Sequence, residues 1–155
     1  MNQGKLDFIS KEFVPLLKDL PAGAKGKWGK MNAQQMVEHV SGFFKVSTQK
    51  LIFPLVTPVE HLPKYREFLL SDSEFRENTQ APGNIVPEEP LPVRNASMNT
   101  ALEELQNEID HFILFFEEVP APKTVHPVFG ELNFEEWVLL HYKHVQHHSK
   151  QFGLL

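Results

Sequence analysis

Apolar residues return every three or four positions in four separate stretches of the chain, and this periodicity constrains the fold more than any other feature. The stretches cover residues 6–20, 32–47, 97–116 and 133–152. No convincing alternation of apolar and polar residues, as expected of a half-buried strand, accompanies them. The sequence therefore predicts an all-α fold, a four-helix bundle, built as one domain over residues 1–155.

Three of the four stretches begin with a residue that suits a helix N-cap. Asn32 is followed three residues later by Gln35, and Asn133 is followed at the same spacing by Glu136, so both pairs can form a capping box. Ser97 is a plausible cap for the third stretch. These positions predict where three of the helices begin.

Prolines mark the remaining boundaries. Pro15 lies inside the first stretch, where it should kink the helix or delay its start. Residues 54–96 form a long proline-rich crossover between the second and third helices. We expect short helical turns at 64–70 and 73–78 and an extended run at 83–93, with the whole crossover ordered and packed along the bundle.

Composition excludes several classes of protein. The net charge is −5 and Lys and Arg never cluster, which argues against nucleic acid as a partner. No apolar run approaches the roughly 20 residues that a membrane-spanning helix needs, and residues 1–13 lack the layout of a secretory signal. The chain has no cysteine, so thiolate metal sites are excluded. We expect a cytoplasmic protein without a membrane partner.

Histidine is the unusual residue, with eight copies, four of which lie within 130–152. His144 and His148 are four residues apart, so at about 100° per residue they lie one above the other on one helix face. Apolar residues share this face, which points the pair into the bundle. This is the spacing at which two imidazoles on one helix reach a single ion.

His39 lies on the flank of the apolar face of the second helix. By itself, such a residue is more often a core histidine with hydrogen-bond partners than a ligand. Opposite His144 and His148, however, it would complete a site with three nitrogens. Zinc and similar divalent ions accept three imidazoles and keep a position for water or substrate.

The other histidines are weaker candidates. His141, one turn before His144, is expected to line the pocket or serve as a spare ligand. His126, in a His-Pro-Val-Phe-Gly loop, either enters the mouth of the site or fixes a turn. His147 should lie at a helix–helix edge, and His111 should face solvent.

Three segments resemble the DinB/YfiT-like superfamily of metalloenzymes: residues 28–39, residues 126–137 and residues 141–148. The branch with the same His-Pro-x-Phe-Gly loop consists of uncharacterised bacterial proteins. The resemblance implies a four-helix bundle with a long crossover, and zinc or nickel held by His39, His144 and His148. It also implies thiol S-transferase or thiol-dependent isomerase activity with bacillithiol, mycothiol or glutathione, and a possible homodimer.

Three functions follow from these observations. The first is a metal-dependent S-transferase that binds a low-molecular-weight thiol and an electrophilic small-molecule substrate, with His141 or His126 assisting proton transfer. The second is a metal-dependent hydrolase, for which Glu38 is the nearest carboxylate in sequence. The third is a non-catalytic metal-binding or interaction protein.

Overall fold

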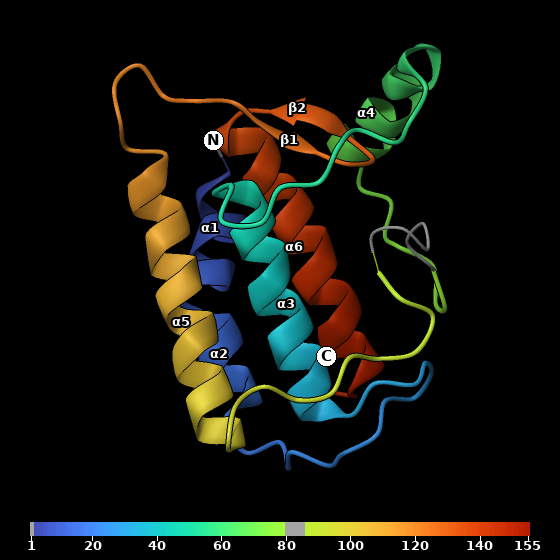
Figure 1. The fold of residues 1–155 in the computed structure, drawn as a ribbon, viewed down its shortest axis with the longest axis vertical. Coiled ribbons are helices and arrows are strands. Elements are labelled where there is room, and N and C mark those ends of the chain that lie inside the picture. Colours follow the sequence, from blue (N-terminus) through green and yellow to red (C-terminus); the bar gives the residue numbers. More distant parts are fainter. Residues whose placement is uncertain (1, 80–85) are drawn as a thin grey trace.

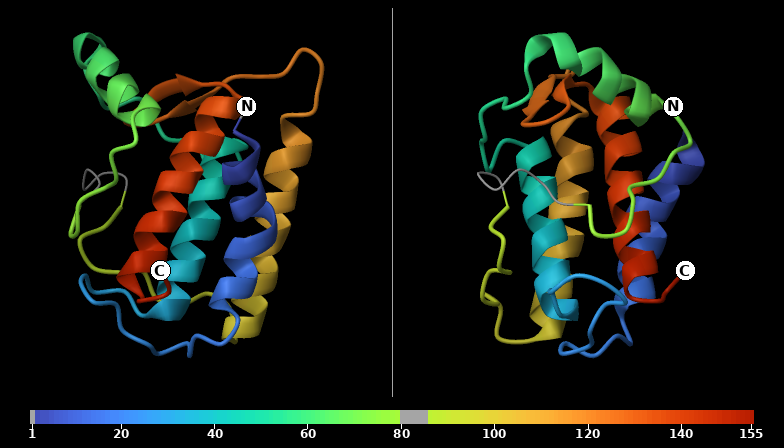
Figure 2. Two further views of the ribbon diagram at one scale, coloured as in Figure 1. Left: turned by 180° about the vertical axis from the view of Figure 1, so that it is seen from behind. Right: turned by 90° about the vertical axis from the view of Figure 1, so that its right-hand side faces the viewer.

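The computed structural model describes residues 2–79 and 86–155. Three long helices pack with an N-terminal helical segment, as Figures 1 and 2 show. The long helices are α3 (Ala33–Ser47), α5 (Met98–Phe115) and α6 (Phe134–Gln151), and the N-terminal segment consists of α1 (Gln3–Asp7), a π-helical turn (Phe8–Glu12) and α2 (Phe13–Leu17). Helices α3 and α6 contact each other and run in opposite directions.

The predicted helix starts are confirmed. The Asn32 side chain accepts a hydrogen bond from the backbone N–H of Gln35, and the Gln35 side chain accepts one from the backbone N–H of Asn32. Asn133 and Glu136 form the same reciprocal pair at the start of α6. The Ser97 side chain caps α5. Each cap satisfies backbone donors that a helix N-terminus otherwise leaves without a partner.

Pro15 does not delay the start of the helix, which begins at Gln3; the backbone instead forms a π-helical turn over Phe8–Glu12, before the proline. Proline has no N–H to donate to the carbonyl four residues earlier, and its ring crowds that carbonyl. The backbone widens over Phe8–Glu12, so that the N–H of Phe13 bonds to the carbonyl of Phe8, and α2 then continues through Pro15. The N-terminal stretch therefore stays helical up to Leu17.

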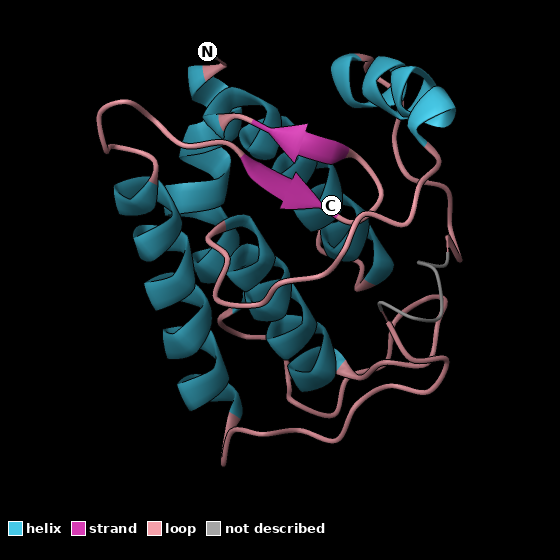
Figure 3. Cartoon of the chain, turned by 45° about the horizontal axis from the view of Figure 1, so that its top comes forward, coloured by secondary structure: helices cyan, strands magenta, loops and turns pink. Residues whose placement is uncertain are grey.

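The prediction of an all-α four-helix bundle is wrong. Strand β1 (Thr124–His126) pairs antiparallel with β2 (Gly130–Leu132), and the hairpin lies across one end of the helices (Figures 1 and 3). Two features of the loop favour this hairpin: Gly130 has a φ of +82°, which glycine adopts without strain, and Nδ1 of His126 accepts hydrogen bonds from the backbone N–H groups of Val128 and Phe129.

In its described part, the crossover between α3 and α5 contains a 3-10 turn (Val59–His61) that leads into α4 (Leu62–Leu70), close to the turn expected at 64–70. The turn expected at 73–78 is not helical. Nζ of Lys143 on α6 instead donates hydrogen bonds to the carbonyls of Ser71 and Ser73, 2.7 and 2.5 Å away, which ties this segment to α6. The run expected to be extended at 83–93 lies in part outside the described residues.

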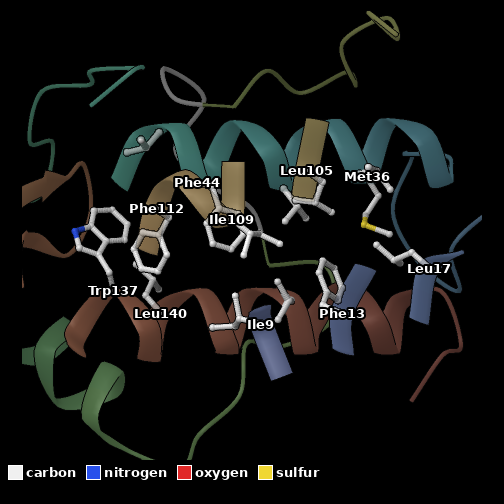
Figure 4. Packing of buried hydrophobic residues seen from close by; sticks show 14 of the residues in the cluster. Ile9, Phe13, Leu17, Met36, Phe44, Leu105, Ile109, Phe112, Trp137 and Leu140 are labelled. Atoms are coloured by element: carbon white, nitrogen blue, oxygen red, sulfur yellow. The ribbon is translucent and has the colours of Figure 1, made fainter. Parts of the chain in front are cut away.

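The core is apolar and continuous between the helices. Most of its largest fully buried side chains come from the N-terminal segment and from the three long helices, and Leu69 and Leu132 add one each from the crossover helix and from β2. Figure 4 shows how those of the helices interleave: Ile9, Phe13, Leu17, Met36, Phe44, Leu105, Ile109, Phe112, Trp137 and Leu140. Each such side chain stabilises the fold by roughly 1.5–3 kcal/mol. Among residues 2–79 and 86–155, no helix combines the length and apolar character required to cross a membrane.

Candidate metal centre

The antiparallel arrangement of α3 and α6 brings the beginning of one helix beside the end of the other (Figure 1). His39 lies two turns into α3, and His144 and His148 lie in the second half of α6. The backbone thus places the three histidines at the same height along the pair of helices. Both His144 and His148 are buried, whereas His39 keeps partial contact with solvent.

The three imidazoles converge on one point. Nε2 of His144 lies 3.0 Å from Nε2 of His39 and 3.0 Å from Nε2 of His148. One nitrogen from each of the three rings falls within 4.8 Å of the other two. Bonds of about 2.1 Å at tetrahedral angles place two ligand nitrogens about 3.4 Å apart, within about half an ångström of these separations.

Hydrogen bonding fixes the protonation of His148. The side-chain nitrogen of Gln151 donates to the backbone carbonyl of Trp28 at 3.0 Å, so its oxygen is left to accept. That oxygen lies 2.7 Å from Nδ1 of His148, which must therefore carry the proton. Nε2 of His148 then presents a lone pair to the centre of the trio, as metal ligation requires.

His144 cannot be satisfied by hydrogen bonds within the trio. A neutral imidazole nitrogen offers either one lone pair or one N–H, so Nε2 of His144 cannot make two good hydrogen bonds at once. Its Nδ1 is buried without a hydrogen-bond partner. A cation at the centre would use the lone pairs of all three Nε2 atoms. The donor set therefore fits a divalent ion that accepts nitrogen ligands.

Burial keeps all three imidazoles neutral. It lowers the pKa of His39 to about 4, with a smaller contribution from repulsion by His147. Burial, followed by repulsion from neighbouring histidines, also holds the pKa values of His144 and His148 well below the ordinary value. The neutral ring is the form that binds metal ions, so at neutral pH ligation by these rings needs no net loss of a proton.

The structure places His141 inside the core. It is fully buried, its ring stacks on that of Phe44 with centroids 3.8 Å apart, and neither ring nitrogen has a hydrogen-bond partner. His126 is also buried, and its Nδ1 closes the β-hairpin loop. The Phe43 ring contacts both of them and packs against His144 at 4.2 Å. A catalytic role for His141 or His126 stays a prediction.

The sequence analysis did not predict the contacts of two further residues near the site, Gln151 and His147. Gln151 orients His148, and the i, i+3 spacing of the two on one helix was the signal that could have identified it. His147, expected at a helix–helix edge, instead packs against Trp28 of the loop before α3 and against Phe75 of the crossover. Contacts with loops have no periodicity, so the sequence held no comparable signal for these two neighbours.

The glycines of the loop before α3 make room for Gln151. A Cβ atom on Gly29, where φ is +78°, would lie 2.8 Å from the side-chain nitrogen of Gln151. A Cβ atom on Gly26 would lie 2.9 Å from Cγ of the same side chain. The loop thus approaches Gln151 more closely than a larger residue allows.

Comparison with known proteins gives one match. The model of a family described as "Protein of unknown function (DUF1569)" matches residues 17–153, which include all three histidines of the candidate centre. No curated protein matches the chain, and no solved structure matches it.

Proposed function

The chain belongs to the family of proteins of unknown function DUF1569, and we propose from its site that it is a metal-dependent enzyme that holds one divalent ion through His39, His144 and His148. One observation carries the proposal: three Nε2 atoms from two helices meet at a point where hydrogen bonding cannot satisfy them all. Zinc and nickel both suit three imidazole ligands.

The chemistry proposed is S-transfer from a low-molecular-weight thiol to an electrophilic small molecule. When bound, the ion would act as a Lewis acid that lowers the pKa of a coordinated thiol. Three protein ligands leave coordination positions for this thiol. His39 is the only partly exposed member of the trio, so its side of the site is the route by which a thiol would enter.

The position of Glu38 favours the thiol over hydrolysis. A metal-dependent hydrolase needs a base beside its water, and Glu38 is the neighbour of His39 in sequence. Its carboxylate instead accepts hydrogen bonds from the backbone N–H groups of Arg94 and Asn95, at 2.7 and 3.1 Å. Burial raises the pKa of Glu38, but these and the other hydrogen bonds that it accepts outweigh burial and keep the pKa below the ordinary value. Glu38 therefore anchors the crossover.

The partly exposed ligand also argues against a purely structural ion. Structural zinc sites are closed by four protein ligands, whereas the cluster found in the described residues has three. A non-catalytic metal-binding protein remains the alternative if no thiol or substrate reaches the ion.

Cobalt-loaded protein tests the proposed chemistry. Addition of 2-mercaptoethanol should produce a new near-ultraviolet absorption band, because sulfur would enter the coordination shell, whereas ethylene glycol of the same size should leave the spectrum unchanged. A spectrum that no thiol alters would contradict the transferase. Hydrolysis of an activated ester without added thiol would support the hydrolase instead.

The proposal also includes three expectations from the sequence: the superfamily, the cytoplasmic location and the homodimer. Membership of the DinB/YfiT-like superfamily is supported by the position of the three ligands, one on α3 and two on α6, which is the pattern that the resemblance implies. The absence of cysteine is in keeping with a cytoplasmic location. Sedimentation analysis would test the homodimer.

A further inference from the structure

A pocket adjoins the three histidines. It has a volume of about 170 Å³ and is formed where the loop before α3, the crossover and the end of α6 meet. We call it the Trp28 pocket, and its lining residues are Trp28, Glu74, Phe75, Glu77, His147 and Lys150.

Aromatic rings form much of its wall. The His147 ring packs against Trp28, with centroids 5.4 Å apart, and edge-on against Phe75, with centroids 6.0 Å apart. A hydrogen bond to the backbone of Phe75 further holds the His147 ring in place. Rings arranged in this way attract organic cations, because the face of each ring carries partial negative charge.

The pocket lies within one ring's width of the candidate metal centre. His147 separates the two, since its ring also packs edge-on against the ligand His148 with centroids 5.1 Å apart. The two sites also share a backbone group, because the carbonyl of Trp28 accepts the hydrogen bond from Gln151, the residue that orients His148. A small molecule held in the pocket would therefore lie beside the ion.

The charges that line the pocket leave one carboxylate in excess. Lys150 forms an ion pair with Glu74. Glu77 forms no ion pair with any residue in the described part of the chain, and it lies close enough to interact electrostatically with His147. The pocket thus offers aromatic faces and one uncompensated negative charge, which together suit a ligand with a single positive charge.

We propose that the Trp28 pocket binds the organic ammonium group of the substrate against its aromatic wall and beside the carboxylate of Glu77. The cavity has room for an amine or trimethylammonium head group, and the remainder of the molecule would extend past His147 to the ion. The claim that a molecule in the pocket also reaches the ion rests on the function proposed above. The claim that the pocket binds an ammonium group is independent of that function.

Zinc-loaded protein and choline provide the test. The chain has two tryptophans, so two indole N–H signals appear in a ¹H–¹⁵N spectrum, and Trp28→Phe assigns them. Choline should shift the Trp28 signal saturably and leave that of the buried Trp137 in place. The isosteric alcohol 3,3-dimethyl-1-butanol, which lacks the charge, should bind about tenfold more weakly.

Glu77→Gln should weaken choline binding about fivefold. Glu131→Gln on β2, an exposed carboxylate outside the pocket, is the matched control and should change nothing. Equal binding of choline and the alcohol, or an unaltered affinity in Glu77→Gln, would overturn the proposal.

The metal content of each sample separates this result from the metal proposal. If the protein binds choline but retains no zinc, the proposal for the pocket is supported and the proposed metal centre is refuted. If it retains zinc but does not bind choline, the metal centre is supported and the proposal for the pocket is refuted. With cobalt-loaded protein, γ-aminobutyrate should alter the visible spectrum at a concentration about tenfold lower than butyrate does, because its ammonium group adds the pocket contact. Equal potency of the two acids would show that the pocket does not serve the ion.

Discussion

Nδ1 of His148 and the side-chain oxygen of Gln151 lie 2.7 Å apart, one helical turn from each other on α6. The other end of the Gln151 amide is held by the backbone carbonyl of Trp28. This chain of two hydrogen bonds settles which nitrogen of His148 faces His39 and His144. The orientation of the third ligand therefore depends on a loop more than 100 residues away in sequence.

Gln151→Ala should weaken zinc binding about 10- to 100-fold, because His148 loses the partner that fixes its tautomer and ring orientation. Competition with a chromophoric chelator measures this affinity. Gln146→Ala, on the same helix but outside the trio, should bind zinc as tightly as the unaltered protein does. An unchanged affinity in Gln151→Ala would show that the hydrogen bond to His148 has no part in ligation.

Gly29→Ala should reduce zinc affinity through Gln151, since its methyl group would displace the amide. The positive φ at this position should also lower the free energy of unfolding by about 1–2 kcal/mol. Gly23→Ala is the control, because nothing lies within 4 Å of a Cβ atom there.

In the Gln151→Ala background, Gly29→Ala should have little further effect on zinc affinity. If the two effects add in full, the loop influences the site by another route.

The sequence predicted the parts of this protein that local chemistry determines. Asn32 and Asn133 identified two helix starts because a capping box needs only residues three positions apart. The four-residue spacing of His144 and His148 predicted a shared face for the same reason. His39 joined them only on the assumption that its helix lies opposite theirs, and the structure brings the three together.

The missed parts depend on contacts distant in sequence. The β-hairpin has only three residues in each strand, too few for alternation to stand out, and its loop depends on the His126 ring and on Gly130. The segment after α4 is held by Lys143 and not by its own periodicity. Trp28 reaches the metal centre through Gln151, which no pattern within the loop could reveal.

His141→Phe should stabilise the metal-free protein. A buried polar group without a partner costs about 1–3 kcal/mol, and phenylalanine fits the same stack on Phe44 without polar atoms. Urea unfolding at pH 7 measures the gain, and His61→Gln, on an exposed turn, should give none. A loss of stability in His141→Phe would mean that the ring has a polar partner.

Acid should destabilise the metal-free protein. Burial lowers the pKa of His126 to about 3 and that of His39 to about 4, with a smaller contribution at His39 from repulsion by His147. In the unfolded chain both residues take up protons below about pH 6.5. Because the folded state binds fewer protons in this window, stability is complete above pH 6.5 and falls as the pH drops towards these values.

Each such histidine contributes a slope of about 1.4 kcal/mol per pH unit. Unfolding free energies measured in urea between pH 7 and pH 5 give the total slope. His141→Phe should reduce this slope by the contribution of about one histidine, since burial also holds the pKa of His141 well below its ordinary value. Stability that does not change over this range would contradict the burial of neutral imidazoles.

Glu38→Ala should lower the free energy of unfolding by about 2 kcal/mol, because two backbone N–H groups of the crossover lose a charged acceptor. Zinc content should not change. Glu103→Ala, an exposed glutamate on α5, is the control for the loss of one charge. If Glu38→Ala lost its zinc but kept its stability, the carboxylate of Glu38 would be a group that acts at the ion.

Elemental analysis tests the central claim most directly. After incubation with excess zinc or nickel and removal of the free ion, the protein should retain about one equivalent of metal per chain, and so should the control His111→Ala. His144→Ala should retain none, because Nε2 of His144 lies between those of the other two ligands. Circular dichroism would establish that the variants are folded. Retention of a full equivalent by folded His144→Ala, or of no metal by the unaltered protein, would contradict the account.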